Sequence, residues 1–161
     1  MIQNYLTFTV AEHVYAINVS SVLEVLNFKV STSVPCALPY IEGLIYSREQ
    51  GITVVNLRKM FNLPEHEADK RTKIIVVEVQ VPTDEVTNHI VLYGLVADSV
   101  QDVIQIYEET RIADAECLIP KEFISFVLNY EDKPLFVLDF NKLFEEPKTV
   151  NLEENLALVN M

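Results

Sequence analysis

The chain repeats itself, and this internal repeat constrains the fold more than any other feature of the sequence. Residues 15–26 return 78 positions later as residues 93–104, with Tyr, a small residue, Ile or Leu, Ser, Val and an acidic residue at matching places. A second pair of segments, 52–61 and 135–144, follows in the same order at an offset of 83. A period of about 80 residues exceeds the roughly 20 to 50 residues of solenoid repeats. The sequence therefore predicts two homologous halves, each a small folded unit of its own.

Apolar and polar residues alternate along most of both halves, which is typical of half-buried β-strands. The halves span roughly residues 15–65 and 73–145, and each supplies about five short strands. Such strands cannot hide both faces of an open sheet, so a pair of small β-barrels is favoured. We expect strands over residues 5–10, 14–19, 40–47, 52–55, 73–81, 90–97, 124–130 and 135–138.

Short helical segments are expected between and after these strands. The capping-box spacing of Ser21 and Glu24 predicts a helical turn there, which the repeat carries over to residues 99–104. Asn56 and Asp139 each precede an apolar pattern with helical spacing and are good N-caps. The fold class predicted from these patterns is mostly β, with two five-stranded barrels and short helices.

The charge of the chain excludes several classes of partner. With 24 acidic and 12 basic residues the net charge is -12, whereas nucleic-acid binders and proteins of anionic bilayer surfaces need a basic face. No apolar run approaches the roughly 18 residues that span a bilayer, and the start does not resemble a signal peptide. We therefore expect a cytoplasmic protein, with Cys36 and Cys117 as structural thiols.

Catalytic and metal-binding patterns are not found in the sequence. His13, His66 and His89 fall in predicted turns or polar loops, without metal-ligand spacing or a partner acid or cysteine. Nucleophile-elbow, P-loop and dinucleotide-binding motifs are missing, and the chain has only 3 glycines. We therefore expect no enzyme activity, no metal and no cofactor, although a motif search does not exclude a carboxylate site.

Several segments share an order and spacing that together are specific. They are residues 34–35, 39–45, 48 and 54–61 in the centre, 16–25 upstream, and 94–103 and 138–140 downstream. Through them residues 4–145 resemble the CheW-like domain family. The resemblance implies a single domain over residues 1–145, made of two SH3-like five-stranded barrels around a shared hydrophobic centre. A C-terminal tail, 146–161, would follow, in which Asn151 and Glu154 have the capping spacing of a short helix.

The resemblance also implies a function. Members of this family are non-catalytic adaptors of bacterial chemotaxis that couple the cytoplasmic tips of chemoreceptors, the methyl-accepting chemotaxis proteins, to the regulatory domain of the histidine kinase CheA. Other CheW-like proteins are further partners, and recruitment to membrane-associated receptor arrays is expected without insertion into the membrane. A receptor helix would bind a groove between the barrels, which is helix-in-groove recognition.

Six positions match places where the family contacts the receptor or holds the groove. Glu24 and Arg48 match an acid and an arginine that the family pairs, so a salt bridge that sets the shape of the groove is expected. The alternative is that Arg48 is an ordinary surface charge, worth roughly 0 to 1 kcal/mol, and that the nearby valines are core residues. The predicted partner-binding residues are Val22, Glu24, Val25, Gly43, Arg48 and Val100.

The chain also departs from the family pattern. Glu49, Thr53, Asn56 and Phe126 stand where the family often has glycine, proline, aspartate and glycine. Because glutamate is costly at positive φ, we expect the turn after Arg48 to move toward Gly51. These departures leave two alternatives open. One is a divergent CheW-like module that serves another signalling complex or competes for the kinase, and the other is an unrelated double barrel that binds a small ligand.

Overall fold

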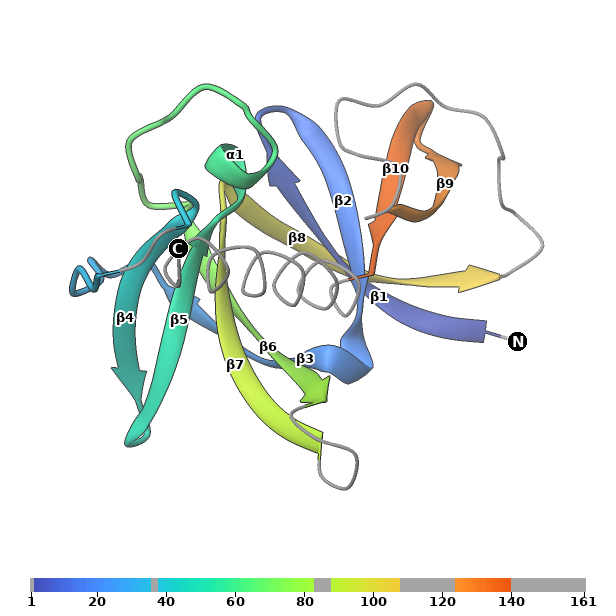
Figure 1. Cartoon of the computed structure of the whole chain (residues 1–161). Coiled ribbons are helices and arrows are strands. Elements are labelled where there is room, and N and C mark those ends of the chain that lie inside the picture. Colours follow the sequence, from blue (N-terminus) through green and yellow to red (C-terminus); the bar gives the residue numbers. More distant parts are fainter. Residues whose placement is uncertain (1, 36–37, 83–87, 108–123, 140–161) are drawn as a thin grey trace, which may run out of the picture.

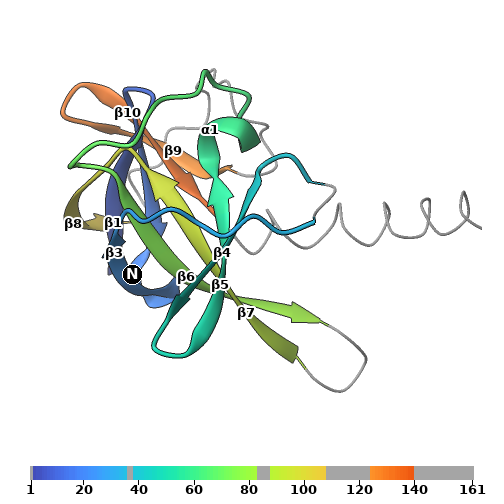
Figure 2. The same cartoon turned by 90° about the vertical axis from the view of Figure 1, so that its left-hand side faces the viewer.

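The computed structural model describes residues 2–35, 38–82, 88–107 and 124–139. These residues form two five-stranded sheets, each curled into a small barrel (Figures 1 and 2). The expected mostly β fold with two SH3-like barrels is confirmed. Barrel A contains, in sheet order, β8 (Ser99–Tyr107), β1 (Ile2–Val10), β2 (His13–Asn18), β10 (Lys133–Leu138) and β9 (Ile124–Tyr130). Barrel B contains β3 (Val22–Asn27), β6 (Lys73–Pro82), β7 (Asn88–Ala97), β5 (Gln50–Asn56) and β4 (Ile41–Ser47).

The two sequence repeats exchange strands between the barrels. Barrel A takes β1 and β2 from the first repeat and β8, β9 and β10 from the second, and barrel B takes the other five strands. When each strand is replaced by its repeat counterpart, the strand order of one barrel becomes that of the other. Neither half alone contains a complete barrel. The expectation that each half is a folded unit of its own is therefore wrong, because strands of the other half complete its sheet.

Among the described strands, each barrel has one parallel pair, and this pair joins a strand of the first repeat to a strand of the second. In barrel B, β5 pairs in parallel with β7, and in barrel A, β10 pairs in parallel with β2. Thr53 faces Tyr93 in the first pair, and Phe136 faces Tyr15 in the second. These residues are related by the offsets of 83 and 78 found in the sequence. The repeat therefore fixes the pairing register as well as the order of the strands.

The described residues form three apolar cores, of which one joins the two barrels. The largest, here called the shared centre, contains buried side chains from both barrels, among them Phe8, Tyr15, Leu95 and Phe136. Each barrel also has an interior core of its own. These are formed by Tyr5, Ala16, Ile106, Leu128, Leu135 and Val137 in barrel A, and by Ile45, Ile52, Val54, Ile74 and Val76 in barrel B.

The turn between β4 and β5 lies at Arg48 and Glu49, both with positive φ, at 52° and 66°. Ser47 pairs with Gln50 directly across it, and Gly51 lies within β5 opposite Tyr46. The expected shift toward Gly51 is therefore wrong. The register of the hairpin is held by its interior residues Ile45 and Ile52, so Glu49 adopts a backbone conformation in which glycine would be less strained.

The predicted helical turns at residues 21–26 and 99–104 are also wrong, because both segments are strands. β3 pairs with β6, and β8 pairs with β1. The capping box does not form, because the Glu24 carboxylate binds Ser47 and Arg48 instead of a backbone amide of its own turn. The helical turn in this region is η1 (Val19–Ser21), which Asn18 caps by accepting a hydrogen bond from the amide of Ser20.

The predicted cap at Asn56 is confirmed. Its side chain accepts a hydrogen bond from the amide of Lys59 at 3.2 Å and begins α1 (Leu57–Met60). Leu57 and Phe61 are buried in the shared centre, and Met60 packs against it. The helix expected after Asp139 and the C-terminal tail, 146–161, lie outside the described residues.

Candidate functional site

The predicted partner-binding residues on β3 lie at an edge of barrel B. β3 is the outermost strand of its sheet and pairs with β6. Val22 is half-buried and packs against the shared centre, whereas Val25 is 40% exposed. Leu23, which occupies a bulge in β3, is 49% exposed. The edge thus presents apolar side chains to solvent next to the shared centre, so Val25 is not an ordinary core residue.

Glu24 and Arg48 form an ion pair beside this edge. Arg48 Nη2 lies 3.5 Å from Glu24 Oε2, and Ser47 Oγ donates a hydrogen bond to Glu24 Oε1 at 3.2 Å. The side chain of Glu24 is 22% exposed and that of Arg48 is 83% exposed. Because Glu24 is on β3 and Arg48 follows β4, the pair joins the two edge strands of barrel B. It lies within one barrel and does not cross between the two.

Gly43 acts through its backbone. It has φ of 151°, and a Cβ added there would collide with the carbonyl oxygen of Thr32. Thr32 bridges to Leu44 through two backbone hydrogen bonds of 2.8 Å, which join the chain after β3 to β4. Gly43 is also buried, so it can affect partner binding only by determining the path of the β4 backbone.

Val100 lies on β8, at the corresponding edge of barrel A. It is the repeat counterpart of Val22 and packs, half-buried, against the same shared centre. The counterpart of Val25 is Val103, which is 59% exposed. The structure therefore has two equivalent apolar edges, one on each barrel. Sequence reasoning missed Leu23 and Val103, although the repeat alone pairs Val103 with Val25.

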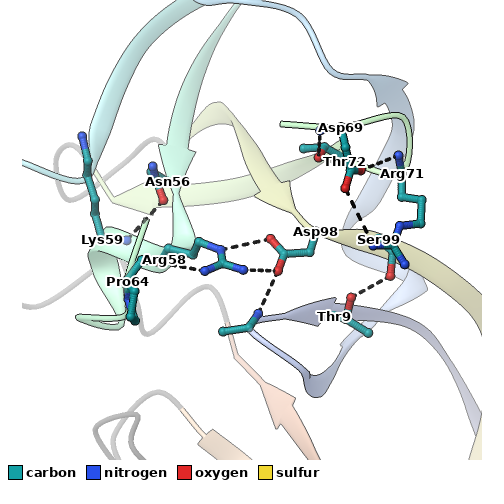
Figure 3. Close-up of polar contacts among 11 residues, drawn as sticks. Thr9, Asn56, Arg58, Lys59, Pro64, Asp69, Arg71, Thr72, Asp98 and Ser99 are labelled. Carbon is teal, nitrogen blue, oxygen red and sulfur yellow. Dashed lines mark hydrogen bonds and ion pairs between the residues drawn. The ribbon is translucent and has the colours of Figure 1, made fainter. Parts of the chain in front are cut away.

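A second polar cluster, which the motif search did not identify, lies where the chain passes from β7 to β8. Asp98 Oδ1 accepts a hydrogen bond from Arg58 Nε at 3.2 Å, and Asp98 Oδ2 accepts one from Arg58 Nη2 at 2.5 Å (Figure 3). Asp98 Oδ2 also accepts from the amide of Ala11 at 2.9 Å, and Arg58 Nη1 donates to the carbonyl of Pro64 at 2.6 Å. Asp98 thus binds α1 of barrel B and the β1–β2 turn of barrel A together.

Both side chains of this ion pair are largely buried, at 14% exposure for Arg58 and 30% for Asp98. Burial raises the pKa of Asp98, but the hydrogen bonds from Arg58 and Ala11 and the charges of Arg58 and His66 outweigh it, so the pKa lies below its ordinary value. Next to the pair, Thr9 Oγ1 and Ser99 Oγ are 2.6 Å apart (Figure 3). The amide of Asp98 donates a hydrogen bond to the carbonyl of Thr9. The carboxylate is therefore held in its charged form between the barrels.

A neighbouring ion network fixes the end of β5. Lys59 Nζ lies 3.0 Å from Glu42 Oε1 and 3.1 Å from Glu65 Oε1, and Asn56 Nδ2 donates to Glu42 Oε1 at 2.8 Å. Burial raises the pKa of Glu42, but the bonds from Asn56 and Lys59 lower it further than burial raises it. The two carboxylates raise the pKa of Lys59. Glu42 and Lys59 are therefore both stabilised in their charged forms.

A cavity of about 190 Å³ lies beside Arg58 and Asp98, lined also by Phe28, Val54 and His66. In the part of the chain that the structure describes, every buried side-chain nitrogen or oxygen has a hydrogen-bond partner. Within the same residues no three His, Cys, Asp or Glu side chains are grouped so as to hold a metal ion. Of the charged groups that line the cavity, Arg58 and Asp98 bind each other. Among the described helices, none has the length and apolarity needed to cross a membrane.

The two interlocked barrels and their apolar edges define a class of protein-interaction domain. The family model of the CheW-like domain matches residues 4–148. The chain therefore belongs to the CheW-like domain family, and its interpretation as an unrelated double barrel is wrong. Its relatives are named chemotaxis proteins and a scaffolding protein, and the family is a non-enzymatic class.

Individual relatives agree with this assignment. The chain is 29% identical over 150 residues to the "Chemotaxis protein CheW" of Bacillus subtilis (strain 168), covering 89% of this chain and 88% of that protein. It is 26% identical over 148 residues to the protein of the same name from Treponema pallidum (strain Nichols), covering 91% and 84%. The crystal structure of the scaffolding protein TtCheW from Thermoanaerobacter tengcongensis superimposes with a TM-score of 0.77 at 27% identity, over 91% of this chain and 90% of that chain.

Proposed function

We propose that this protein is a coupling adaptor that binds the cytoplasmic tip of a chemoreceptor and the regulatory domain of the kinase CheA. Its place of action is the cytoplasm, at membrane-associated receptor arrays. Residues 1–145 are the adaptor domain, and 146–161 are a tail. The observation that carries the proposal is the apolar edge of β3, where Leu23 and Val25 are 49% and 40% exposed beside the ion pair of Glu24 and Arg48.

The β3 edge suits an amphipathic helix. A helix presents apolar side chains three and four residues apart on one face, which can pack on Leu23 and Val25 above the half-buried Val22. Arg48, 83% exposed, adds a positive charge at the rim of this surface in a chain of net charge -12. Rim charges of this kind change association rate and partner choice more than affinity. Val100, at the corresponding edge of barrel A, would contact a partner in the same way.

A titration against each isolated partner tests the proposal. The full chain is titrated with the CheA regulatory domain and, separately, with a receptor-tip fragment from the same cell. Val25→Asp should weaken receptor binding at least tenfold, which corresponds to about 1.4 kcal/mol, because a carboxylate would be desolvated under the docked helix. Ile90→Asp is the matched control, since it introduces the same charge at an exposed apolar position of β7, outside the two apolar edges.

Each outcome has a distinct meaning. The adaptor is supported if the protein binds both partners with micromolar affinity and if Val25→Asp loses more receptor affinity than the control variant does. Binding to the kinase domain alone would favour a competing regulator or a module of another signalling complex. Glu49, which follows Arg48 at the tip of the hairpin, is the feature that would favour such a specialised role, since it adds a negative charge there. Binding to neither partner would contradict the proposal.

A further inference from the structure

The chain passes between the barrels at two crossings that the repeat makes equivalent. The first leads from β2 to β3 through η1, and the second leads from β7 to β8 through Asp98. The repeat offset of 78 places Ser20 of the first crossing opposite Asp98 of the second. The two crossings have the same topology but different side chains, so they can be compared directly within one molecule.

The crossing at Asp98 is held by directional polar contacts to both barrels. The Asp98 carboxylate accepts two hydrogen bonds from Arg58, at the end of barrel B, and one from the amide of Ala11, at the β1–β2 turn of barrel A. Arg58 is itself anchored by the carbonyl of Pro64. A two-pronged arginine–carboxylate pair fixes orientation as well as distance, because both of its hydrogen bonds must remain linear.

Among the described residues, no charged side chain binds the Ser20 crossing to both barrels in this way. Residues 18–22 carry no charged side chain, and Ser20 is exposed. The described polar side-chain contacts at this crossing are local or stay within barrel A: the amide of Ser20 donates to Asn18 Oδ1, and Asn18 Nδ2 donates to Gln3 Oε1. The barrels also meet through the shared centre, against which Val19 and Val22 pack, but these apolar contacts are less directional than the hydrogen bonds of Asp98.

We infer that Asp98 is a positioning residue: its bonds to Arg58 and Ala11 set the angle between the two barrels, and the Ser20 crossing acts as the hinge about which that angle would otherwise vary. The apolar edges on β3 and β8 belong to different barrels, so their relative placement depends on this angle. The consequence for partner binding rests on the proposed adaptor function, whereas the inference about the barrel angle does not.

Residual dipolar couplings of backbone amides in the full chain measure the angle without any partner. For the unmodified protein, one alignment tensor should fit the amides of both barrels. Asp98→Ser gives the second crossing the residue that the first crossing has. In this variant each barrel should still fit its own tensor, but the common fit should be lost. Arg58→Lys, which keeps the charge but removes the two-pronged geometry, should produce a smaller divergence of the same kind.

Asp102→Ser is the matched control, because it removes an exposed carboxylate from β8, the strand that begins after Asp98. It should leave the common tensor intact. If Asp98→Ser and Arg58→Lys also keep the common tensor, Asp98 contributes stability alone and the inference is overturned. Should Asp98→Ser fail to fold, Arg58→Lys and Asp98→Asn decide the question by the same measurement.

A binding measurement then separates this inference from the proposed function. Loss of the common tensor in Asp98→Ser should be accompanied by a several-fold weaker affinity for the receptor-tip fragment, although Asp98 lies at the opposite crossing from β3. If the unmodified protein does not bind the fragment, the adaptor proposal fails while the result on the barrel angle stands. Unchanged affinity in a variant with divergent tensors would overturn the link between the angle and binding.

Discussion

Tyr15 and Tyr93 occupy equivalent positions in the two barrels, each on the strand that forms its barrel's parallel pair. Both are buried in the shared centre, at 2% and 3% exposure. The ring of Tyr15 lies 5.6 to 5.7 Å from the rings of Phe8, Phe61 and Phe136, which come from both barrels. The shared centre therefore joins the two barrels, and the ring of Tyr15 on β2 contributes through its contact with Phe61, which follows α1.

This coupling predicts that the two barrels unfold together. Tyr15→Ala should lower the free energy of unfolding by about 3 to 5 kcal/mol, as for other large aromatic truncations in cores. Amide hydrogen exchange should accelerate to a similar extent in β2 of barrel A and in β7 of barrel B. Exchange that accelerates in barrel A alone would contradict the coupling. Tyr130→Ala, at a half-buried position beside the barrel A interior, is the local control.

The strained turn at Glu49 predicts a stabilising substitution. Glu49→Gly should raise the free energy of unfolding by about 1 kcal/mol, because glycine adopts positive φ without the steric cost that a side chain carries. Chemical denaturation of both proteins measures the difference. Gln50→Gly, one residue later in β5, should instead be destabilising, since it adds backbone freedom within a strand. Equal effects of the two substitutions would show that the turn is not strained.

Gly43 and Gly51 should respond differently to the same change. Gly43→Ala should destabilise the protein by at least about 1 to 3 kcal/mol, because φ of 151° is disfavoured for alanine and the new Cβ meets the Thr32 carbonyl. Gly51→Ala should be tolerated, since its Cβ would lie 3.7 Å from the ring of Tyr46, an ordinary contact. The two melting temperatures test this contrast, which fails if both variants unfold alike.

The lowered pKa of Asp98 predicts a pH-dependent contribution to stability. A carboxyl whose pKa is lowered by folding adds stability above its unfolded pKa, about 3.9, and loses that contribution as the pH falls through the folded pKa. Near neutral pH the protein should therefore be more stable than Asp98→Asn, and the gap should close as the pH falls below about 4. Urea unfolding across this range measures the gap. A gap independent of pH would mean that the charge of Asp98 is not involved.

The ion pair of Glu24 and Arg48 predicts a compensating double substitution. Either Glu24→Arg or Arg48→Glu alone should weaken binding to the receptor tip, because two like charges would then face each other where the edge strands β3 and β4 meet. The double reversal should restore part of the affinity, while stability changes by no more than about 1 kcal/mol for so exposed a pair. Lack of any restoration would contradict a role for the pair in shaping the binding surface.

Much of the fold was predictable because the repeat and the strand alternation depend on local sequence. The hairpins form where period-two alternation brackets a short turn, and Asn56 caps α1 because its side chain needs only the amide of Lys59, three residues on. β3 was mistaken for a helical turn because six residues with apolar spacing suit either structure. Pairing with β6, some 50 residues away, decided the outcome.

The polar cluster at Asp98 was not predictable in the same way. Arg58 and Asp98 are 40 residues apart and meet only because the chain crosses from barrel B to barrel A at Asp98. One signal did exist, since Asp98 stands where the repeat has Ser20. The aligned repeats also differ at Asn18 and Val96 and at Leu23 and Gln101, so the comparison marks Asp98 as one of several candidates and does not name its partner Arg58.

The most direct test of the adaptor account is a three-component assembly. The CheA regulatory domain and a receptor-tip fragment, at concentrations where they do not bind each other, are mixed with or without the full chain and separated by size-exclusion chromatography. The account predicts that both partners co-elute only when the chain is present, and that Val25→Asp releases the receptor fragment while keeping the kinase domain. Partners that each bind the chain but displace one another would contradict coupling and indicate a competitor instead.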